Sequence, residues 1–215
     1  MDSVTRAAPA TETSRRPHDF VAPRASSFRA LLSERTTLTE VEAAGYLTAA
    51  WHERFREAAG HAAPVLLAHW ALETDRGRHM PGFNFAGIKA HAGDAEGAVL
   101  ETVEGFGATA RRVHCRFRSY RTPLDGARDY VNLLANHYPE AVFAARAGDP
   151  ARFVDALQQG GYFTGDPAAY RSASLRLWRE FVPFVQGVQR LRVDAPAFLV
   201  EAVVFAFQRA SAHRG

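Results

Sequence analysis

Glu73 is a carboxylic acid at the end of the most hydrophobic segment in the first half of the chain. It follows Trp70 by three residues and Leu66 by seven, so a helix would put all three side chains on one face. Apolar neighbours and the negative end of a helix dipole both disfavour a charged carboxylate, and both therefore raise its pKa. A carboxyl group that keeps its proton near neutral pH can act as a general acid. The alternative is that Glu73 has reached the surface and pairs with Arg76 or Arg78.

Two further acids, Glu101 and Glu104, lie in a predicted β-hairpin. Side chains alternate along a strand, so these two face opposite ways and only one can point toward a cleft in front of the helices. An acid at a helix end that faces a second carboxylate is the arrangement that glycoside hydrolysis needs, because one group protonates the leaving oxygen while the other activates water. The alternative is that both are solvated strand residues that balance nearby arginines.

Other kinds of catalytic site find little support in the sequence. The nine histidines are scattered, and His52-Glu53 does not continue into the zinc-binding pattern His-Glu-x-x-His. The single cysteine, Cys115, excludes an intramolecular disulfide framework, and its alternation with apolar residues predicts a buried thiol rather than a nucleophile. The sequence contains no phosphate loop and no nucleotide fingerprint. We therefore expect no metal and no other cofactor.

The elements that must position these residues are mostly helical from Phe28 onward. Each predicted helix begins with a start signal and carries apolar residues at helical spacing. The start signals are Thr37 or Thr39 for a helix to about residue 59, Pro64 for an apolar helix through Leu72, then Thr122-Pro123, Asp149-Pro150 and Asp166-Pro167. Pro183 and Gly187 are expected to interrupt or kink the last of these helices.

Between these helices the hydrophobic period changes to two residues. Val113, Cys115 and Phe117 alternate with polar residues, which predicts a half-buried strand over 112–118. The run 99–103 can pair with it across a glycine-containing turn, and the preceding stretch 76–97 is expected to be loop. The fold class is therefore mainly α, with a helical core and one small β-hairpin.

Length and composition fit one domain with tails. The chain has 215 residues, of which 47% are hydrophobic and 23% are charged, so it is not wholly disordered. No stretch reaches about 18 uninterrupted apolar residues, so no membrane span is expected. All basic residues except Lys89 are arginines, and they form no continuous basic tract, so we expect no nucleic-acid partner. The apolar stretch 198–207 is either a packed terminal helix or a partner surface.

Five segments of the chain resemble, in order and spacing, the motifs of the bacterial glucosaminidase family of peptidoglycan hydrolases. This family includes cell-wall autolysins and the hydrolase domain of the flagellar rod protein. Each motif is weak alone, but the five together span roughly residues 38–182. They are Ala71–Gly77 (resembling "ALES-x-x-G"), Asn84–Ala90 ("N-L-F-G-I-K-A"), Thr102–Glu104 with Arg116–Tyr120 ("T-x-E … K-F-R-x-Y"), Asp129–Leu134 ("DY-x-x-LL") and Gly161–Pro167 with Tyr170 ("GYATDP-x-Y").

The resemblance implies a lysozyme-like α+β fold in which the hairpin lobe lies over a substrate groove. It also implies cleavage of the β-1,4 bond after N-acetylglucosamine in peptidoglycan. Glu73 falls on the family's catalytic acid, Glu104 on its hairpin carboxylate, and Tyr162 on its substrate-contacting tyrosine. Phe85 and Tyr130 are further candidates for sugar contact, although a core position is the more common fate of such residues.

The sequence departs from the family's motifs at several positions. Gly105 stands where a tyrosine usually follows the hairpin acid, Ala86 replaces a phenylalanine, Arg76 replaces an aromatic residue, and Gly165 is an extra residue. These changes thin the aromatic lining expected for the groove. With Glu104 on the family motif, Glu101 is no longer expected to be the base.

Composition and the resemblance together divide the chain into a flexible leader (1–27), which is rich in Ala, Thr, Ser, Pro and Arg, a glucosaminidase-like catalytic domain (28–190) and a C-terminal helical extension (191–215). The resemblance covers the middle part. It implies a periplasmic or secreted location, although the leader lacks the apolar core of a standard signal peptide. Besides glycan strands, it allows for a protein partner such as a secretion apparatus, a rod component or an immunity protein.

Several alternatives to an endo-β-N-acetylglucosaminidase stay open at this point. One is a catalytically weak glycan-binding component of a cell-wall-spanning assembly. Another is a lytic transglycosylase or muramidase that acts as a phage lysin or a secreted antibacterial toxin. The sequence also leaves open whether cleavage proceeds with inversion or with retention assisted by the substrate's own acetamido group.

Overall fold

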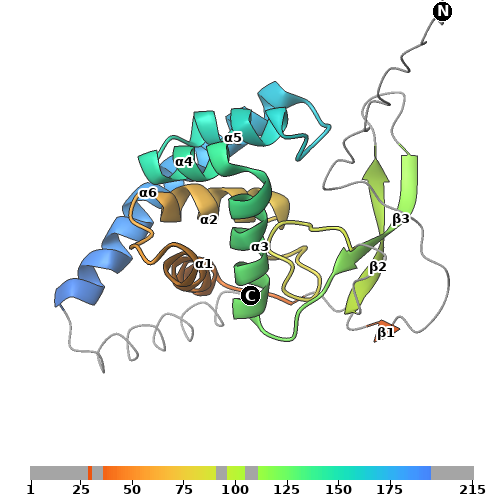
Figure 1. Ribbon diagram of the computed structural model, residues 1–215, viewed down its shortest axis with the longest axis horizontal. Coiled ribbons are helices and arrows are strands. Elements are labelled where there is room, and N and C mark those ends of the chain that lie inside the picture. Colours follow the sequence, from red (N-terminus) through yellow and green to blue (C-terminus); the bar gives the residue numbers. More distant parts are fainter. Residues whose placement is uncertain (1–28, 31–35, 91–95, 105–110, 195–215) are drawn as a thin grey trace, which may run out of the picture.

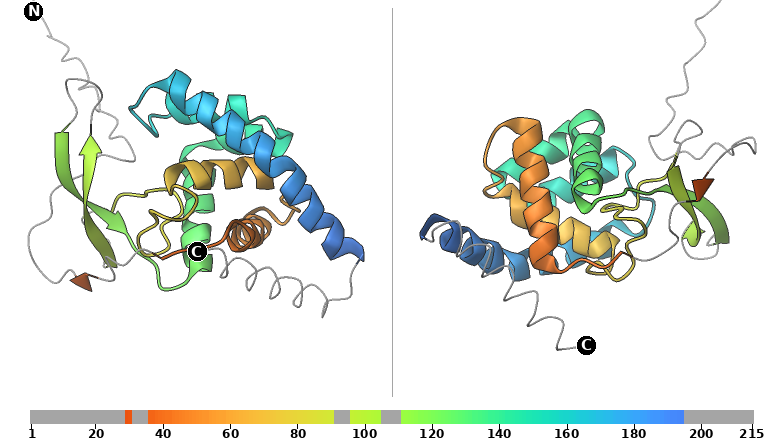
Figure 2. Two further views of the ribbon diagram at one scale, coloured as in Figure 1. Left: turned by 180° about the vertical axis from the view of Figure 1, so that it is seen from behind. Right: turned by 90° about the horizontal axis from the view of Figure 1, so that it is seen from below.

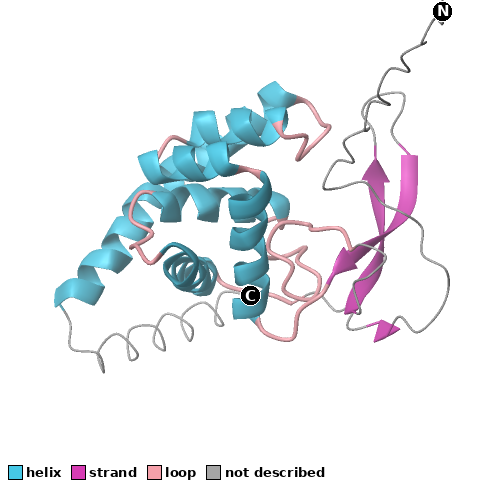
Figure 3. Cartoon of the chain, viewed as in Figure 1, coloured by secondary structure: helices cyan, strands magenta, loops and turns pink. Residues whose placement is uncertain are grey.

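The computed structural model describes residues 29–30, 36–90, 96–104 and 111–194. At residues 29–30, 96, 102–104 and 188–194 it describes the backbone alone. Within this part of the chain the fold is mainly helical with one small sheet, as predicted (Figures 1 and 3). The helices are α1 (Glu40–Phe55), α2 (Ala62–Glu73), α3 (Pro123–His137), α4 (Pro139–Ala147), α5 (Pro150–Gln159) and α6 (Pro167–Asp194).

The predicted helix start signals lie at the observed helix ends except at Pro64, because α2 begins two residues earlier, at Ala62, without a side-chain cap. Thr39 caps α1 and forms a capping box with Glu42, so each satisfies a backbone N–H of the other. Thr122 accepts a hydrogen bond from the backbone N–H of Asp125 at the start of α3. Asp149 accepts from two backbone N–H groups at the start of α5. These caps offset the unpaired donors of a first helical turn and fix where each helix begins.

Helix α2 is the central element of the helical part, and Figure 2 shows other helices on several sides of it. Every residue from Ala62 to Ala71 is buried, which agrees with a segment that is apolar nearly all round. Trp51 of α1 and Trp70 of α2 are among the largest fully buried side chains. This packing fixes the axis of α2 and therefore the position of its last residue, Glu73.

Two features of the helical part differ from the expectation. Helix α6 runs through Pro183 and Gly187 to Asp194, so the expected interruption does not occur. Helix α4 was not predicted. It begins at Pro139, and only Tyr138 separates it from the end of α3, which is too short a connection to carry a visible loop signal.

The small sheet has the strand order β1-β2-β3, with β1 at Arg29–Ala30, β2 at Glu96–Glu104 and β3 at Arg111–Arg118. Strands β2 and β3 form the predicted antiparallel hairpin, in which Glu101 pairs with His114 and Glu104 pairs with Arg111. The two-residue β1 adds to β2 in parallel and was not predicted. The alternation in β3 holds only in part, because Arg116 is 8% exposed although it lies on the strand face expected to be open.

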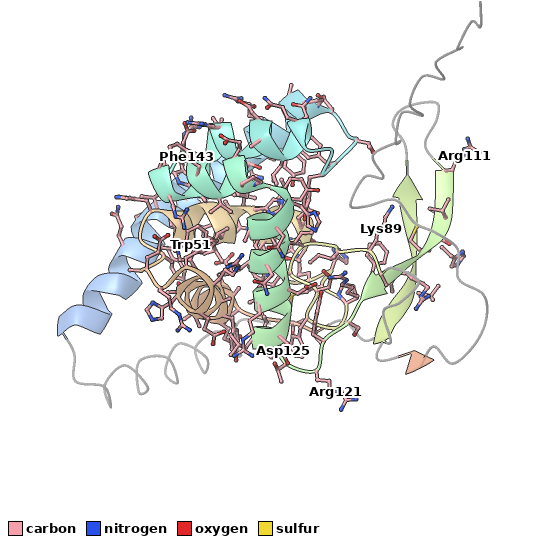
Figure 4. All side chains as sticks on the ribbon, in the orientation of Figure 1. Trp51, Lys89, Arg111, Arg121, Asp125 and Phe143 are labelled. Atoms are coloured by element: carbon pink, nitrogen blue, oxygen red, sulfur yellow. The ribbon has the colours of Figure 1, made fainter. Side chains whose placement is uncertain are left out.

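The hairpin stands to one side of the helices, and the segment after α2 runs between the two parts (Figure 1). This segment is joined to β3 by backbone hydrogen bonds, from Arg118 N–H to Ile88 O and from Ala90 N–H to Arg116 O, both 2.9 Å long. Lys89 forms an isolated bridge with Phe117 and lies between the helices and the hairpin in Figure 4. The chain after Glu73 therefore links the helical part to the sheet.

The expected leader 1–27 and the apolar stretch 198–207 lie outside the described residues, as does the glycine-containing turn of the hairpin. Across the helices that are described, none combines the length and the apolar character needed to cross a membrane.

Candidate active site

Glu73 is the last residue of α2, where a carboxyl group faces the negative end of the helix dipole. Its side chain is 20% exposed, so it is largely removed from water yet still reachable from outside. Burial raises the pKa of Glu73 to about 7, although a hydrogen bond from Tyr170 acts in the opposite direction. A substantial share of the carboxyl groups therefore keeps its proton near neutral pH, which is the form that a general acid needs.

The alternative interpretation of Glu73 as a surface residue paired with an arginine does not hold. Arg76 pairs with Glu40 of α1 at 2.5 Å and with Glu180 of α6 at 2.6 Å. Arg78 pairs with Asp75 at 2.6 Å. Both arginines therefore have carboxylate partners other than Glu73.

Aromatic hydroxyls and one imidazole surround the Glu73 carboxyl group. The Tyr170 hydroxyl of α6 donates to Glu73 Oε1 at 2.5 Å. His69 lies one turn back on α2, with Nε2 3.7 Å from the same oxygen. Burial and the charge of Glu73 raise the pKa of Tyr170 well above its ordinary value, so Tyr170 stays a neutral donor. Sequence reasoning gave neither residue a role, although the i, i+4 spacing of His69 and Glu73 on a buried helix was a usable signal.

The chain turns sharply after α2 and comes back past Glu73. Asp75, Arg76 and Gly77 all have positive φ angles, of 49°, 56° and 81°. A Cβ on Gly77 would lie 2.8 Å from the Leu38 carbonyl oxygen, so only glycine fits there. Further along, a Cβ built on Gly87 would lie 3.6 Å from Glu73 Oε2. The loop backbone thus approaches the carboxyl group closely from the side of Oε2.

Asn84 holds this loop in place through hydrogen bonds of its side chain. The residue is 1% exposed. Its Nδ2 donates to the carbonyl oxygens of Ile88 and Arg118, each at 2.9 Å, and its Oδ1 accepts from the backbone N–H of Ile88 at 2.9 Å. One amide side chain therefore closes the loop on itself and fastens it to β3.

The candidate sugar-binding aromatics are buried. Phe85 and Tyr130 are both 0% exposed, so neither offers a ring face to a glycan in this structure, which favours the core alternative over sugar contact for both. Phe85 packs near Trp70, with 6.3 Å between the ring centroids, in the core beneath the loop. The Tyr130 hydroxyl is 2.6 Å from His69 Nδ1, which puts it behind Glu73 rather than at the surface. Both residues support the site from inside because the apolar core takes up their rings.

Tyr162 is 8% exposed, and its hydroxyl donates to the Ala86 carbonyl oxygen at 2.6 Å. It thereby supports the loop next to Glu73, and its contact with substrate stays a prediction.

The side chain of Glu104 lies outside the described residues, so its distance from Glu73 is untested. Glu101 is 48% exposed and pairs with Arg112 at 2.6 Å, which agrees with a solvated strand residue.

A cavity of about 390 Å³ lies at the opposite end of α2 and does not include Glu73. Its lining includes His61 and Pro64 from the start of α2, Gly148 after α4, and Trp178 of α6. The groove expected between the helices and the hairpin is thus a separate feature and stays a prediction.

Comparison with known proteins relates this geometry to a family. A family model named glucosaminidase, and described as mannosyl-glycoprotein endo-β-N-acetylglucosaminidase, matches residues 49–181, which is more than half of the chain. The chain belongs to the glucosaminidase family. The predicted membership is therefore confirmed, and with it the assignment of the domain to a class of glycoside hydrolases. The matched region contains the whole cluster around Glu73.

Relatives and solved structures agree with this family. Peptidoglycan hydrolase FlgJ of Escherichia coli K12 is 34% identical over 112 residues, which cover 48% of this chain and 35% of FlgJ. FlgJ of Salmonella typhimurium is 32% identical over 120 residues, which cover 52% of this chain and 37% of that FlgJ. The chain thus matches only about a third of the length of these relatives. A crystal structure of a peptidoglycan hydrolase mutant from Sphingomonas sp. A1 superposes with a TM-score of 0.50 at 28% identity, over 63% of this chain and 92% of that one. The lysozyme-like glucosaminidase fold is confirmed.

Proposed function

We propose that this chain is a peptidoglycan hydrolase that cleaves the β-1,4 bond after N-acetylglucosamine, with Glu73 as the general acid. The observation that carries the proposal is the setting of Glu73 at the end of a buried helix, 20% exposed and with a pKa raised to about 7 by burial. Family membership and the FlgJ relatives support the reaction class. Such a substrate requires a periplasmic or secreted location.

In the proposed reaction the protonated Glu73 donates its proton to the glycosidic oxygen as the C–O bond breaks. The electron pair of that bond goes to the leaving oxygen, positive charge develops on the sugar ring, and Glu73 is left as a carboxylate. The hydroxyl of Tyr170, 2.5 Å from Oε1, is already oriented to donate to that carboxylate. Either a water molecule activated by Glu104 or the substrate's acetamido oxygen then attacks the anomeric carbon.

Digestion of purified sacculi followed by mass analysis of the soluble fragments tests this proposal. We expect muropeptides that end in reducing N-acetylglucosamine. Fragments with anhydro-muramyl ends would identify a lytic transglycosylase instead, and reducing N-acetylmuramic acid would identify a muramidase. Binding of glycan without release of fragments would overturn the proposed hydrolysis and favour a binding component.

The pH dependence of cleavage tests the protonation state of Glu73. An acid must carry its proton, and the pKa of Glu73 is raised to about 7, so the rate should be high below that value and fall as the pH rises through it. We expect kcat/KM to decline about tenfold per pH unit above pH 8. Initial rates of reducing-end formation from about pH 5 to about pH 9 measure this decline on the alkaline side of the pH–rate profile. A rate that keeps rising above pH 8 would contradict the assignment of Glu73 as the acid.

A pair of hairpin variants tests the role proposed for Glu104. Glu104→Gln should lower kcat about ten- to a thousandfold, because water would lose its base while the acetamido route remained. Glu101→Gln is the matched control on the same strand. It should stay within about twofold of the unmodified protein, since Glu101 is exposed and paired with Arg112. Equal losses in the two variants would argue against a specific role for Glu104.

A further inference from the structure

The two oxygens of the Glu73 carboxyl group have different surroundings. Oε1 accepts the hydrogen bond from Tyr170 at 2.5 Å and lies 3.7 Å from His69 Nε2. Oε2 lies on the side of the loop, where a Cβ built on Gly87 would be 3.6 Å away. Hydrogen-bond donors therefore gather on one oxygen, and the backbone of the loop passes the other.

His69 is held behind this carboxyl group with one nitrogen unpaired. The residue is 2% exposed, and burial lowers its pKa to about 3, so the imidazole is neutral. Nδ1 lies 2.6 Å from the Tyr130 hydroxyl. Nε2 has no hydrogen-bond partner among the residues that the structure describes. A buried polar atom without a partner is destabilising, so its position beside Glu73 calls for a reason.

The direction of the hydrogen bond at Nδ1 determines whether Nε2 carries a proton that it can donate to Glu73. When the Tyr130 hydroxyl donates to Nδ1, the ring proton is on Nε2 and points toward Oε1. In the other tautomer Nε2 would present a lone pair to the lone pairs of Oε1, which is unfavourable once Glu73 is ionised. A shift of about 0.8 Å would bring Nε2–H within hydrogen-bond distance of the carboxylate.

Three tyrosines that feel the charge of Glu73 stay neutral. They come from three different elements: Tyr130 of α3, Tyr162 after α5, and Tyr170 of α6. Burial raises the pKa of each of these tyrosines well above its ordinary value. Of these three hydroxyls only that of Tyr170 donates to Glu73, whereas that of Tyr130 lies 2.6 Å from His69 Nδ1 and that of Tyr162 donates to the Ala86 carbonyl oxygen.

We propose that His69, oriented by Tyr130, is a positioning residue that directs its Nε2–H at Oε1 of Glu73 and so keeps the acid proton on Oε2. The proposal rests on the proposed function, in which Glu73 is the acid. With Tyr170 and His69 both donating to Oε1, that oxygen takes the carbonyl role, and the proton leaves from Oε2 on the side of Gly87. The same two donors then stabilise the carboxylate that remains after the proton has moved to the glycosidic oxygen.

Two substitutions of His69 separate this role from a structural one. In His69→Gln the side-chain amide reaches the position of Nε2 and keeps a donor toward Glu73. In His69→Asn the amide reaches only the position of Nδ1, so a partner for Tyr130 remains but the donor toward Glu73 is lost. We expect the pKa of Glu73 to rise by roughly half a unit to one unit in His69→Asn and to change by less than about 0.3 units in His69→Gln.

The pKa of Glu73 is measured by ¹³C NMR titration of its carboxyl carbon, assigned by its absence in Glu73→Gln. The basic limb of the rate profile should shift upward by the same amount, with kcat about fivefold lower and KM within about twofold in His69→Asn. A purely structural residue would change the melting temperature in both variants without moving this pKa. An unchanged pKa in His69→Asn, or an equal shift in both variants, would overturn the proposal.

A third variant covers the case in which the His69 variants do not fold. Tyr130→Phe removes the hydroxyl that selects the tautomer and should raise the pKa of Glu73 in the same direction by a smaller amount, whereas no shift would overturn the proposal. The carboxyl titration does not need activity. If the unmodified protein releases no glycan fragments, the proposed function fails, while the pKa measurements still decide whether His69 acts on Glu73.

Discussion

Glu73→Gln is expected to lower the rate of glycan cleavage about 10²- to 10⁴-fold, the range that a positioned general acid contributes. Glutamine keeps the shape of the side chain and can accept the hydrogen bond from Tyr170, but it holds no transferable proton. The measurement is the release of reducing ends from purified sacculi. Glu140→Gln, an exposed carboxyl on α4 that pairs with Arg152, is the matched control and should keep its activity within about twofold.

The stability of the same variant separates loss of the acid from loss of the fold. The pKa of Glu73 is about 7 in the folded chain and 4.5 in an ordinary glutamate, so the folded state holds a proton that the unfolded state releases between these values. The free energy of unfolding therefore falls as the pH rises from about 4.5 to about 7 and is then constant. Glu73→Gln lacks this loss and should be more stable at pH 8 by about 1–3 kcal/mol. An inactive variant that is also less stable at pH 8 would contradict this explanation.

Asn84→Ala should lower the free energy of unfolding by about 2–4 kcal/mol and reduce cleavage at least tenfold. The substitution leaves the buried Ile88 N–H without its acceptor and removes the donor to the carbonyl oxygens of Ile88 and Arg118, and an unpaired buried group costs about 1–3 kcal/mol. The loop beside Glu73 would no longer be fixed to β3. Denaturant unfolding followed by circular dichroism measures the first effect, and sacculus digestion measures the second.

Two further substitutions sharpen this prediction. Asn84→Asp keeps the acceptor for the Ile88 N–H but replaces the donor that faces two carbonyl oxygens, so it should be at least as destabilising as the alanine variant. Asn136→Ala, at an exposed site on α3, should change stability by less than about 0.5 kcal/mol. A small effect at Asn84 would mean that the loop is held by other contacts.

Local signals in the sequence were sufficient for most of the helices, because caps such as Thr39 and Asp149 act on their own first turn. The position of Glu73 also followed from a local pattern, since an apolar helix that ends in an acid is visible without tertiary contacts. The motif resemblance then identified the family and the fold. The predictions that failed were those that depended on how distant parts of the chain pack together. Arg116 is an example, because it is buried although strand alternation put it on the open face.

The surroundings of Glu73 could not be predicted for the same reason. Tyr170 lies 97 residues from Glu73 along the chain, and Tyr130 lies 61 residues from His69. Nothing local distinguishes a tyrosine that faces a sugar from one that donates a hydrogen bond inside the core. Only the packing of α2 against α3 and α6 determines which hydroxyl reaches the acid, and that packing is a property of the whole fold.

The β2–β3 hairpin is attached to the helices at one end, the Arg118 end of β3, which is called its base here. Near that base, Asp129 of α3 accepts hydrogen bonds from Arg118, at 2.8 Å, and from Tyr120, while β3 extends from Arg118 to Arg111 at the far end. At about 3.3 Å per residue this arm is about 23 Å long, so a rotation of about 5° at the base moves the far end by about 2 Å. Glu104 pairs with Arg111 at that end, so its backbone travels with the tip. A small rotation near Asp129 therefore gives its largest displacement at the Glu104 end of the hairpin and, under the role proposed for Glu104, changes its separation from Glu73.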